Sequence, residues 1–119
     1  MMNVNAKRVL HVEDTKSQQL YIGAILAGIV DVTWASTLKE ARSLIKDSKF
    51  DLVLIDFTLP DGSGSDLINE LAAHDPPIPV IVFSAHDLSD NMVNVRNVFV
   101  KGRFKEQDLI NAVRSICSL

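Results

Sequence analysis

Cysteine is almost missing from the sequence: Cys117 is the only one among 119 residues. A disulfide within the chain is therefore excluded, and this cysteine is interpreted as a small apolar residue that fills space. No apolar run approaches the roughly 20 residues that a membrane-spanning helix needs. Residues 1–8 lack the apolar stretch of a secretory signal, so the sequence predicts a cytoplasmic protein.

An excess of positive charge is also lacking. The formal net charge is −3, and the basic residues are scattered along the chain, which argues against nucleic-acid binding. The three histidines, His11, His74 and His86, are too dispersed to indicate a metal site. His11 lies inside the first apolar run and is interpreted as a core residue whose polar atoms are hydrogen-bonded.

What the sequence does contain is an alternation of short apolar runs with segments of helical period. Its length suits one domain and is too short for two, so a single domain over residues 1–119 is expected, with its core at about 8–117. The apolar runs predict strands over residues 8–12, 30–34, 51–55, 78–83 and 97–100. The segments of helical period predict helices over residues 17–29, 38–48, 65–73 and 106–116.

This alternation also predicts the class of fold. Three of the expected strands are almost continuously apolar, as parallel strands are when helices cover both faces of their sheet. The pattern therefore predicts an α/β protein with a doubly wound parallel sheet. Residues 87–98, DLSDNMVNVRNV, stand where a further helix is expected but hold three Asn and other poor helix formers, so a short or irregular helix is predicted there.

Polar residues stand where the expected strands end. Glu13 and Asp14 follow the first strand, Asp56 follows the run LVLI, Ser84 follows the fourth strand and Lys101 follows the fifth. Taken singly, each is more simply a turn former, a helix cap or a solvated surface residue. Because the carboxyl ends of parallel strands lie at one edge of a sheet, all five are expected to converge there.

This set of side chains indicates a particular chemistry. Three neighbouring carboxylates repel one another unless a cation relieves them, and oxygen ligands without His or Cys suit Mg²⁺. A lysine and a hydroxyl beside the metal would bind an anion with several oxygens, such as a phosphoryl group. Carboxylates can act as nucleophiles that form aspartyl phosphates. The sequence therefore predicts an aspartate that is phosphorylated with the help of Mg²⁺.

Several stretches, in this order, resemble receiver domains of response regulators in two-component signalling. VLHVEDTK resembles the first strand and acidic pair of the family, and LVLIDFTLPDGSG resembles its phospho-acceptor strand and loop. VIVFSAH is similar to the strand that ends in a hydroxyl residue, and VFVKG to the strand that supplies the lysine. VTWASTLKEA resembles the second strand and helix, so the resemblance covers nearly the whole chain. It implies a flavodoxin-like fold with strand order 2-1-3-4-5.

The resemblance also implies roles for the residues at the strand ends. Asp56 would be the phospho-acceptor. Asp14, Asp56 and the backbone carbonyl of Thr58 would bind Mg²⁺ (or Mn²⁺) directly, and Glu13 would act through a water. Ser84 and Lys101 would each bind an oxygen of the phosphoryl group.

The resemblance further implies a donor and a limited reactivity. The donor would be a phosphohistidine on a histidine kinase or a histidine phosphotransfer protein. The chain would catalyse only its own phosphorylation and dephosphorylation, and would not be an enzyme on other substrates. Whether it is a stand-alone receiver or part of a hybrid kinase or larger regulator stays open.

Three features depart from the family pattern. Gly102 follows the lysine where the family usually has a proline, so a trans Lys101–Gly102 peptide bond is expected. Val98 stands three positions before the lysine, where the family tends to have an aromatic switch residue, and Phe99 is expected on the opposite face of its strand. The span from Ser84 to Lys101 is shorter than usual. These features bear on the output surface rather than on the phosphorylation chemistry.

Two other functions compete with a phosphorylated receiver. A phosphatase resembling the haloacid dehalogenases also uses an aspartate nucleophile at a strand end with Mg²⁺, but it needs a second Asp two residues later, where this chain has Thr58. A degenerate receiver that only binds partners is the other alternative, although all five residues of the site are present.

The first expected helix has two apolar faces. One is expected to pack on the sheet and consists of Ile22, Ile25, Leu26 and Ile29. The opposite face carries small or apolar residues without charge, namely Leu20, Gly23, Ala24 and Ala27. Because the first helix of receivers commonly docks against kinase or phosphotransfer helices, the resemblance implies that this face binds the phosphohistidine partner.

Overall fold

The computed structural model describes residues 6–86 and 92–119. Five strands form one parallel sheet in the order β2-β1-β3-β6-β7, which confirms the predicted doubly wound topology. A two-residue hairpin, β4 with β5, was not predicted. The strands are β1 (Arg8–Val12), β2 (Asp31–Ala35), β3 (Leu52–Asp56), β4 (Thr58–Leu59), β5 (Gly62–Ser63), β6 (Val80–Ser84) and β7 (Val95–Val100).

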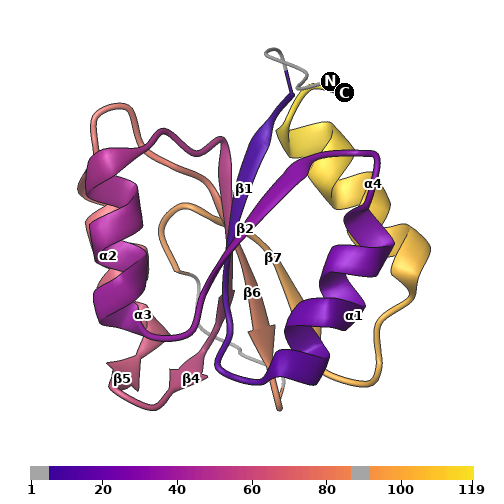
Figure 1. Ribbon diagram of the computed structural model, residues 1–119, viewed down its shortest axis with the longest axis horizontal. Helices are drawn as coiled ribbons and strands as arrows, with labels where there is room; N and C mark the ends of the chain where they lie inside the picture. The colour runs from indigo at the N-terminus through magenta and orange to yellow at the C-terminus, as the bar shows by residue number, and fades with distance from the viewer. Residues whose placement is uncertain (1–5, 87–91) are drawn as a thin grey trace.

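Helices cover both faces of the sheet, as Figure 1 shows, with α2 and α3 on one face and α1 and α4 on the other. The helices in the described residues are α1 (Lys16–Leu26), α2 (Leu38–Asp47), α3 (Gly64–Ala73) and α4 (Glu106–Ile116). None of them combines the length and the apolar character that a bilayer crossing requires.

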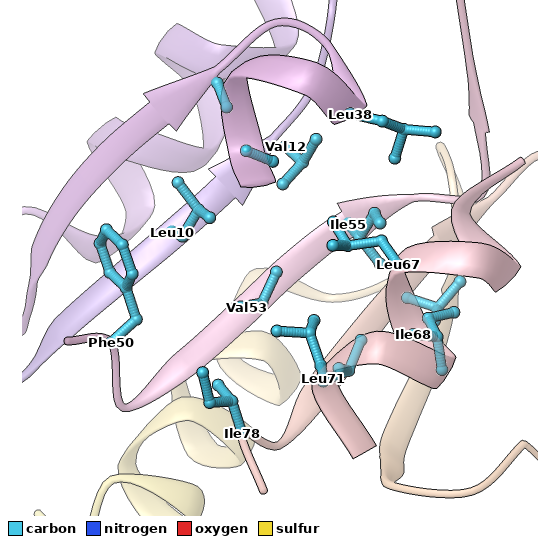
Figure 2. Packing of buried hydrophobic residues seen from close by; sticks show 14 of the residues in the cluster. Leu10, Val12, Leu38, Phe50, Val53, Ile55, Leu67, Ile68, Leu71 and Ile78 are labelled. Carbon is cyan, nitrogen blue, oxygen red and sulfur yellow. The ribbon is translucent and has the colours of Figure 1, made fainter. Parts of the chain in front are cut away.

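The core consists of one apolar cluster on each side of the sheet. Every residue of β3 and β6 is buried, which explains why both read as continuous apolar runs. Successive side chains of β3 point to opposite faces, so Val53 and Ile55 join the cluster under α2 and α3, whereas Leu54 joins the one under α1 and α4. Figure 2 shows the first of these clusters, with Leu71 and Ile78 closing one end of it.

Several element ends differ from the prediction by one residue, and the backbone explains two larger differences. The fourth expected strand begins at Val80 instead of Ile78, because Pro79 has no N–H with which to continue a ladder. Helix α1 ends at Leu26 instead of Ile29, because Gly28 takes a φ of 79°, a left-handed conformation that stops helices.

The helix predicted over residues 87–98 is not found where the structure describes the chain. Residues 87–91 of that segment lie outside the described residues. Its remainder contains a turn with Asn94 at a φ of 72°, followed by β7, which begins at Val95 and not at Asn97. The β-branched residues of this segment, which are poor helix formers, therefore lie in an edge strand, where their shape is favourable.

Candidate functional site

The carboxyl ends of the strands carry the polar residues to one edge of the sheet, as their positions in the sequence predict. Three backbone hydrogen bonds align the strand ends across this edge. The N–H of Glu13 donates to the carbonyl oxygen of Ala35 at 2.9 Å. The N–H of Phe57 donates to the carbonyl oxygen of Phe83, also at 2.9 Å. The N–H of Lys101 donates to the carbonyl oxygen of Ser84 at 2.8 Å. The loops that follow the strands are thus fixed at their starting points.

Three carboxylates meet at this edge. Oxygens of Glu13, Asp14 and Asp56 lie within 4.8 Å of one another. Glu13 is 1% exposed and Asp56 6% exposed, whereas Asp14 is exposed to solvent. The cluster therefore has two buried members and one that faces solvent. The structure brings together all three carboxylates that the sequence analysis selected.

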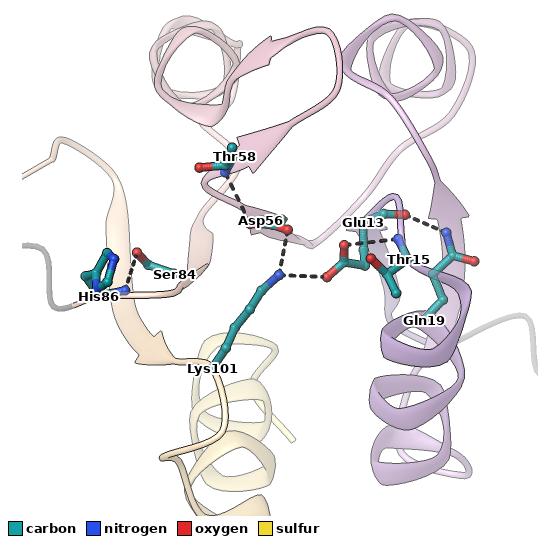
Figure 3. Close-up of polar contacts among 8 residues, drawn as sticks. All are labelled: Glu13, Thr15, Gln19, Asp56, Thr58, Ser84, His86 and Lys101. Atoms are coloured by element: carbon teal, nitrogen blue, oxygen red, sulfur yellow. Dashed lines mark hydrogen bonds and ion pairs between the residues drawn. The ribbon is translucent and has the colours of Figure 1, made fainter.

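Lys101 is the counter-charge of this cluster. Its Nζ lies 2.6 Å from Oδ2 of Asp56 and 3.2 Å from Oε1 of Glu13, as Figure 3 shows. Burial favours the neutral form of the lysine, but the hydrogen bonds and charges of the two carboxylates outweigh it, so the pKa of Lys101 is raised. The ammonium is therefore fully charged at neutral pH and held against the proposed nucleophile.

The environment of Glu13 disfavours its ionised form. Burial, its hydrogen bond with Asp14 and the charge of Asp56 raise the pKa of Glu13, against the opposing effects of the N–H of Thr15 and of Lys101. One lysine thus does not fully offset three carboxylates. The donor set is all oxygen and has an excess of negative charge, which fits a small, hard cation such as Mg²⁺. The residues present therefore fit the metal that the sequence predicts.

Thr58 and Ser84 flank the carboxylates less directly. The N–H of Thr58 donates to Oδ1 of Asp56 at 3.2 Å, which places the backbone of Thr58 against the proposed acceptor. Ser84 is 6% exposed, and its Oγ accepts a 3.3 Å hydrogen bond from the N–H of His86, which leaves the hydroxyl proton free to donate. Among the described residues, no side-chain hydrogen bond joins Ser84 to Asp56 or Lys101, so the structure places it only at the same edge.

Two residues of the site region were missed by the sequence analysis. Gln19 is buried on α1, in the helical stripe that continues with Ile22 and Leu26, and a polar residue in that stripe was an available signal. Asp61, in the turn between β4 and β5, accepts hydrogen bonds from the first residues of α2. An aspartate in a turn ordinarily serves the turn itself, so its sequence position gave no signal.

The loop after Lys101 departs from the family pattern in a defined way. The Lys101–Gly102 peptide bond is trans, as predicted. The N–H of Arg103 donates to the carbonyl oxygen of Val100 at 3.0 Å, and Gly102 has a φ of 75°, the geometry of a type II turn. Proline, whose φ is locked near −65°, cannot occupy that position.

Introducing the family's usual proline should therefore damage this protein. We expect Gly102→Pro to lower the free energy of unfolding by more than the roughly 1–2 kcal/mol that a left-handed conformation costs an ordinary L-residue. Gly102→Asn is the matched control, because Asn tolerates this conformation and the space around the glycine is open. Urea unfolding measures both changes, and a Gly102→Pro variant as stable as the wild type would contradict the prediction.

His11 is buried as expected, but one of its polar atoms is not satisfied. The residue is 1% exposed, and its Nδ1 has no hydrogen-bond partner among the described residues. The ring meets Phe83 edge-on, with centroids 6.1 Å apart. Burial, together with the charge of Lys101, lowers the pKa of His11 from 6.5 to about 4. The interpretation of a fully hydrogen-bonded core histidine is therefore wrong for this atom.

Replacing His11 with a residue of similar size should stabilise the fold. We expect His11→Leu to raise the free energy of unfolding by about 1–3 kcal/mol at pH 7.5, because a buried unsatisfied polar atom is removed. The unfolded chain binds a proton near pH 6.5 and the folded one only near pH 4, so the wild type loses stability as the pH falls between these values.

The advantage of the variant should accordingly grow by about 2 kcal/mol between pH 7.5 and pH 5. Urea unfolding at the two pH values, in EDTA, measures it. An advantage that does not change with pH would show that His11 does not titrate in this way.

Comparisons with known proteins show the family to which the chain belongs. A family model described as the response regulator receiver domain matches residues 9–114. The chain is 32% identical over 95 residues to the swarming motility regulation protein RssB of Serratia marcescens, an alignment that covers 76% of this chain and 43% of that protein. It is 34% identical over 83 residues to the regulatory protein LuxO of Vibrio vulnificus, which covers 69% of this chain and 18% of that protein.

Solved structures give the same result. The receiver domain of the Francisella response regulator 1452 is 27% identical and superposes with a TM-score of 0.82, covering 94% of this chain and 97% of that one. The signal receiver domain of a putative Luxo repressor protein from Vibrio parahaemolyticus is 28% identical, with a TM-score of 0.85 and coverages of 95% and 91%.

The chain therefore belongs to the response regulator receiver domain family of two-component signalling. It spans less than half of the length of the curated relatives RssB and LuxO. The phosphatase alternative, which Thr58 already disfavoured, gains no support from any of these matches.

Proposed function

We propose that this receiver domain is an active phospho-acceptor and that Asp56 receives the phosphoryl group from a phosphohistidine of a histidine kinase or phosphotransfer protein. The contact between Lys101 and Asp56, 2.6 Å from Nζ to Oδ2, carries the proposal. It places a permanent positive charge where negative charge accumulates during phosphoryl transfer. A degenerate receiver would not require this buried, charge-matched arrangement.

The residues of the site have separate tasks in this reaction. A carboxylate oxygen of Asp56 forms a bond to phosphorus while the bond from phosphorus to the donor imidazole nitrogen breaks, so the donor histidine leaves without the phosphoryl group. Lys101 and the hydroxyl of Ser84 bind phosphoryl oxygens, and the N–H of Thr58 orients the carboxylate of Asp56. Asp14, Asp56 and the carbonyl of Thr58 would hold Mg²⁺, with Glu13 acting through a water. The metal, when bound, neutralises charge on the transferring group.

The domain catalyses only its own phosphorylation and dephosphorylation in this proposal. The direct test is incubation with acetyl phosphate and Mg²⁺ followed by intact-mass measurement. We expect an adduct of about 80 Da, one phosphoryl group, that is lost on alkaline treatment, as an acyl phosphate should be. Peptide mapping should place it within the segment that contains Asp56. A protein that never acquires the adduct would be the degenerate receiver instead.

The partner would dock on the outer face of α1, at Leu20, Ala24 and Ala27. All three are exposed, Leu20 by 53%. Gly23 was also expected on this partner-binding face, but it lies against Trp34 of the same chain. A Cβ added to Gly23 would lie 3.1 Å from Cζ2 of Trp34, so this glycine makes room for the indole within the fold. Trp34, itself 41% exposed, extends the same apolar face onto the edge strand β2.

A charge on this face should slow transfer from the partner alone. We expect Leu20→Glu to reduce the rate of phosphotransfer from the cognate phosphohistidine protein at least tenfold (1.4 kcal/mol at the contact), with acetyl-phosphate labelling and melting temperature nearly unchanged. Leu119→Glu is the matched control, since Leu119 is 54% exposed at the C-terminus, which lies beside the N-terminus and away from the carboxyl ends of the strands (Figure 1). An unchanged rate of phosphotransfer to Leu20→Glu would show that this face of α1 does not contact the partner.

A further inference from the structure

The connection between β2 and α2, residues 35–39, contacts both loops that carry the proposed metal ligands. On one side, the carbonyl of Ala35 accepts the N–H of Glu13, which directly precedes Asp14. On the other side, the N–H groups of Leu38 and Lys39 contact the turn that follows Thr58. This connection, here called the β2–α2 junction, thus lies between two segments that are far apart in the sequence.

Gln19 fastens the junction to the loop of Glu13 and Asp14. The residue is 9% exposed, and its side-chain amide donates to the carbonyl oxygen of Glu13 at 2.5 Å and to Oγ of Ser36 at 3.3 Å. One buried amide group therefore joins α1, the end of β1 and the junction. Figure 3 shows the bond from Gln19 to the backbone of Glu13 beside the carboxylate that contacts Lys101.

Asp61 fastens the junction to the loop of Thr58. Its Oδ1 accepts the N–H of Leu38 at 2.9 Å, and its Oδ2 accepts the N–H of Lys39 at 3.1 Å. These bonds satisfy free donors at the start of α2, where a negative charge is also favoured by the helix dipole. The hydrogen bond from Leu38 accordingly lowers the pKa of Asp61, so the carboxylate stays ionised at neutral pH.

Apolar packing strengthens the same contact. The side chain of Leu38 is 2% exposed, and its Cδ1 would lie 3.1 Å from a Cβ added to Gly62. Gly62 also has a φ of 146°, which an ordinary L-residue rarely adopts. The turn between β4 and β5 is thus held to the first turn of α2 by two charge-assisted hydrogen bonds and by a close approach of Leu38 to Gly62.

We propose that the β2–α2 junction is a brace that sets the separation between the loop of Asp14 and the loop of Thr58, with Gln19 and Asp61 as positioning residues for the metal site. This inference rests on the proposed function, which requires Mg²⁺ between those loops. Mg²⁺ demands near-ideal octahedral ligand positions, so ligands supplied by two separate loops bind it tightly only if the loops are held in register. Lys101 links the side chains of Glu13 and Asp56, whereas the brace links the backbones of their loops.

The test measures the affinity for Mg²⁺ rather than phosphorylation. MgCl₂ is titrated into isotope-labelled protein, and the dissociation constant is taken from amide chemical shifts for wild type, Asp61→Ala, Asp61→Asn, Gln19→Met and the double variant Gln19→Met/Asp61→Ala. Asp66→Ala is the matched control, because Asp66 is an exposed carboxylate in the first turn of α3 and its removal changes the net charge equally. Melting temperatures in EDTA record purely structural effects.

We expect Asp61→Ala to weaken Mg²⁺ binding by about tenfold, the lower end of what second-layer residues of metal sites contribute. Asp61→Asn, which keeps one acceptor oxygen, should show a smaller loss, and Asp66→Ala should change the dissociation constant less than twofold (about 0.4 kcal/mol). Loss of either connection, that of Gln19 or that of Asp61, already frees the two loops. The double variant should therefore bind Mg²⁺ no more weakly than the single variant with the lower affinity.

Three results would overturn the brace while leaving the metal site of the proposed function in place. One is a lower melting temperature in EDTA with an unchanged dissociation constant, which would make the contacts merely structural. Another is a double variant whose loss is the product of the two single losses, which would mean that the residues act separately. A third is an equally large loss of Mg²⁺ affinity in Asp66→Ala and Asp61→Ala, which would show that the effect comes from net charge alone. If the wild type itself binds no Mg²⁺, the metal site of the proposed function fails, and the brace fails with it.

Discussion

Asp56→Asn is expected to abolish phosphorylation by acetyl phosphate completely. The amide of asparagine is a poor nucleophile, whereas the carboxylate of Asp56 is held by Lys101 and by the N–H of Thr58 in a fixed orientation. Glu13 has comparable contacts, with Lys101 and the N–H of Thr15, but it is only 1% exposed and so less accessible to a donor than Asp56. Asp14 faces solvent. The adduct of about 80 Da should therefore disappear and not move to a neighbour.

The measurement is intact mass over a time course of labelling, with Asp66→Asn as the matched control. That variant makes the same chemical change in an exposed carboxylate of α3, outside the cluster, and should label at the rate of the wild type. Asp56→Asn should also remain folded, because removing one of three mutually repelling carboxylates relieves strain. A full adduct in Asp56→Asn would refute the assignment of the acceptor.

The sequence was sufficient for the topology because its signals are local and repeated. Apolar runs such as Leu52–Ile55 are too short for buried helices and too continuous for half-exposed strands, so they indicate parallel strands covered on both sides. Once the sheet is parallel, the residue after each strand must lie at one edge. The convergence of Glu13, Asp56 and Lys101 follows from that geometry alone, before any side-chain contact is known.

The features that escaped prediction are those set by contacts distant in sequence. The bonds from Leu38 and Lys39 to Asp61 span 23 and 22 residues, and both partners have ordinary local explanations as a helix start and a turn. The unsatisfied Nδ1 of His11 depends on what surrounds the ring from other strands and helices. Element boundaries were missed where one residue decided them, as Pro79 and Gly28 did.

Asp14→Ala is expected to remove the effect of Mg²⁺ on stability. A metal that binds only the folded protein stabilises it by about 1.4 kcal/mol at ten times its dissociation constant. For a domain of this size that should raise the melting temperature by roughly 3–6 °C. Asp14 is the solvent-exposed member of the carboxylate cluster, and the proposed site loses a direct ligand without it.

The same substitution should have the opposite effect on the metal-free protein. In EDTA, Lys101 is the one cation among the described residues that pairs with the three carboxylates, and Asp14 contributes to the raised pKa of Glu13. Removing Asp14 therefore relieves repulsion, and the variant should melt at or above the temperature of the wild type in EDTA while failing to respond to MgCl₂. Thermal unfolding of wild type, Asp14→Ala and the control Asp66→Ala, each with EDTA and with MgCl₂, separates the two effects. Because a nonspecific salt effect would stabilise all three proteins alike, equal Mg²⁺ responses in wild type and Asp14→Ala would rule out the carboxylate cluster as the metal site.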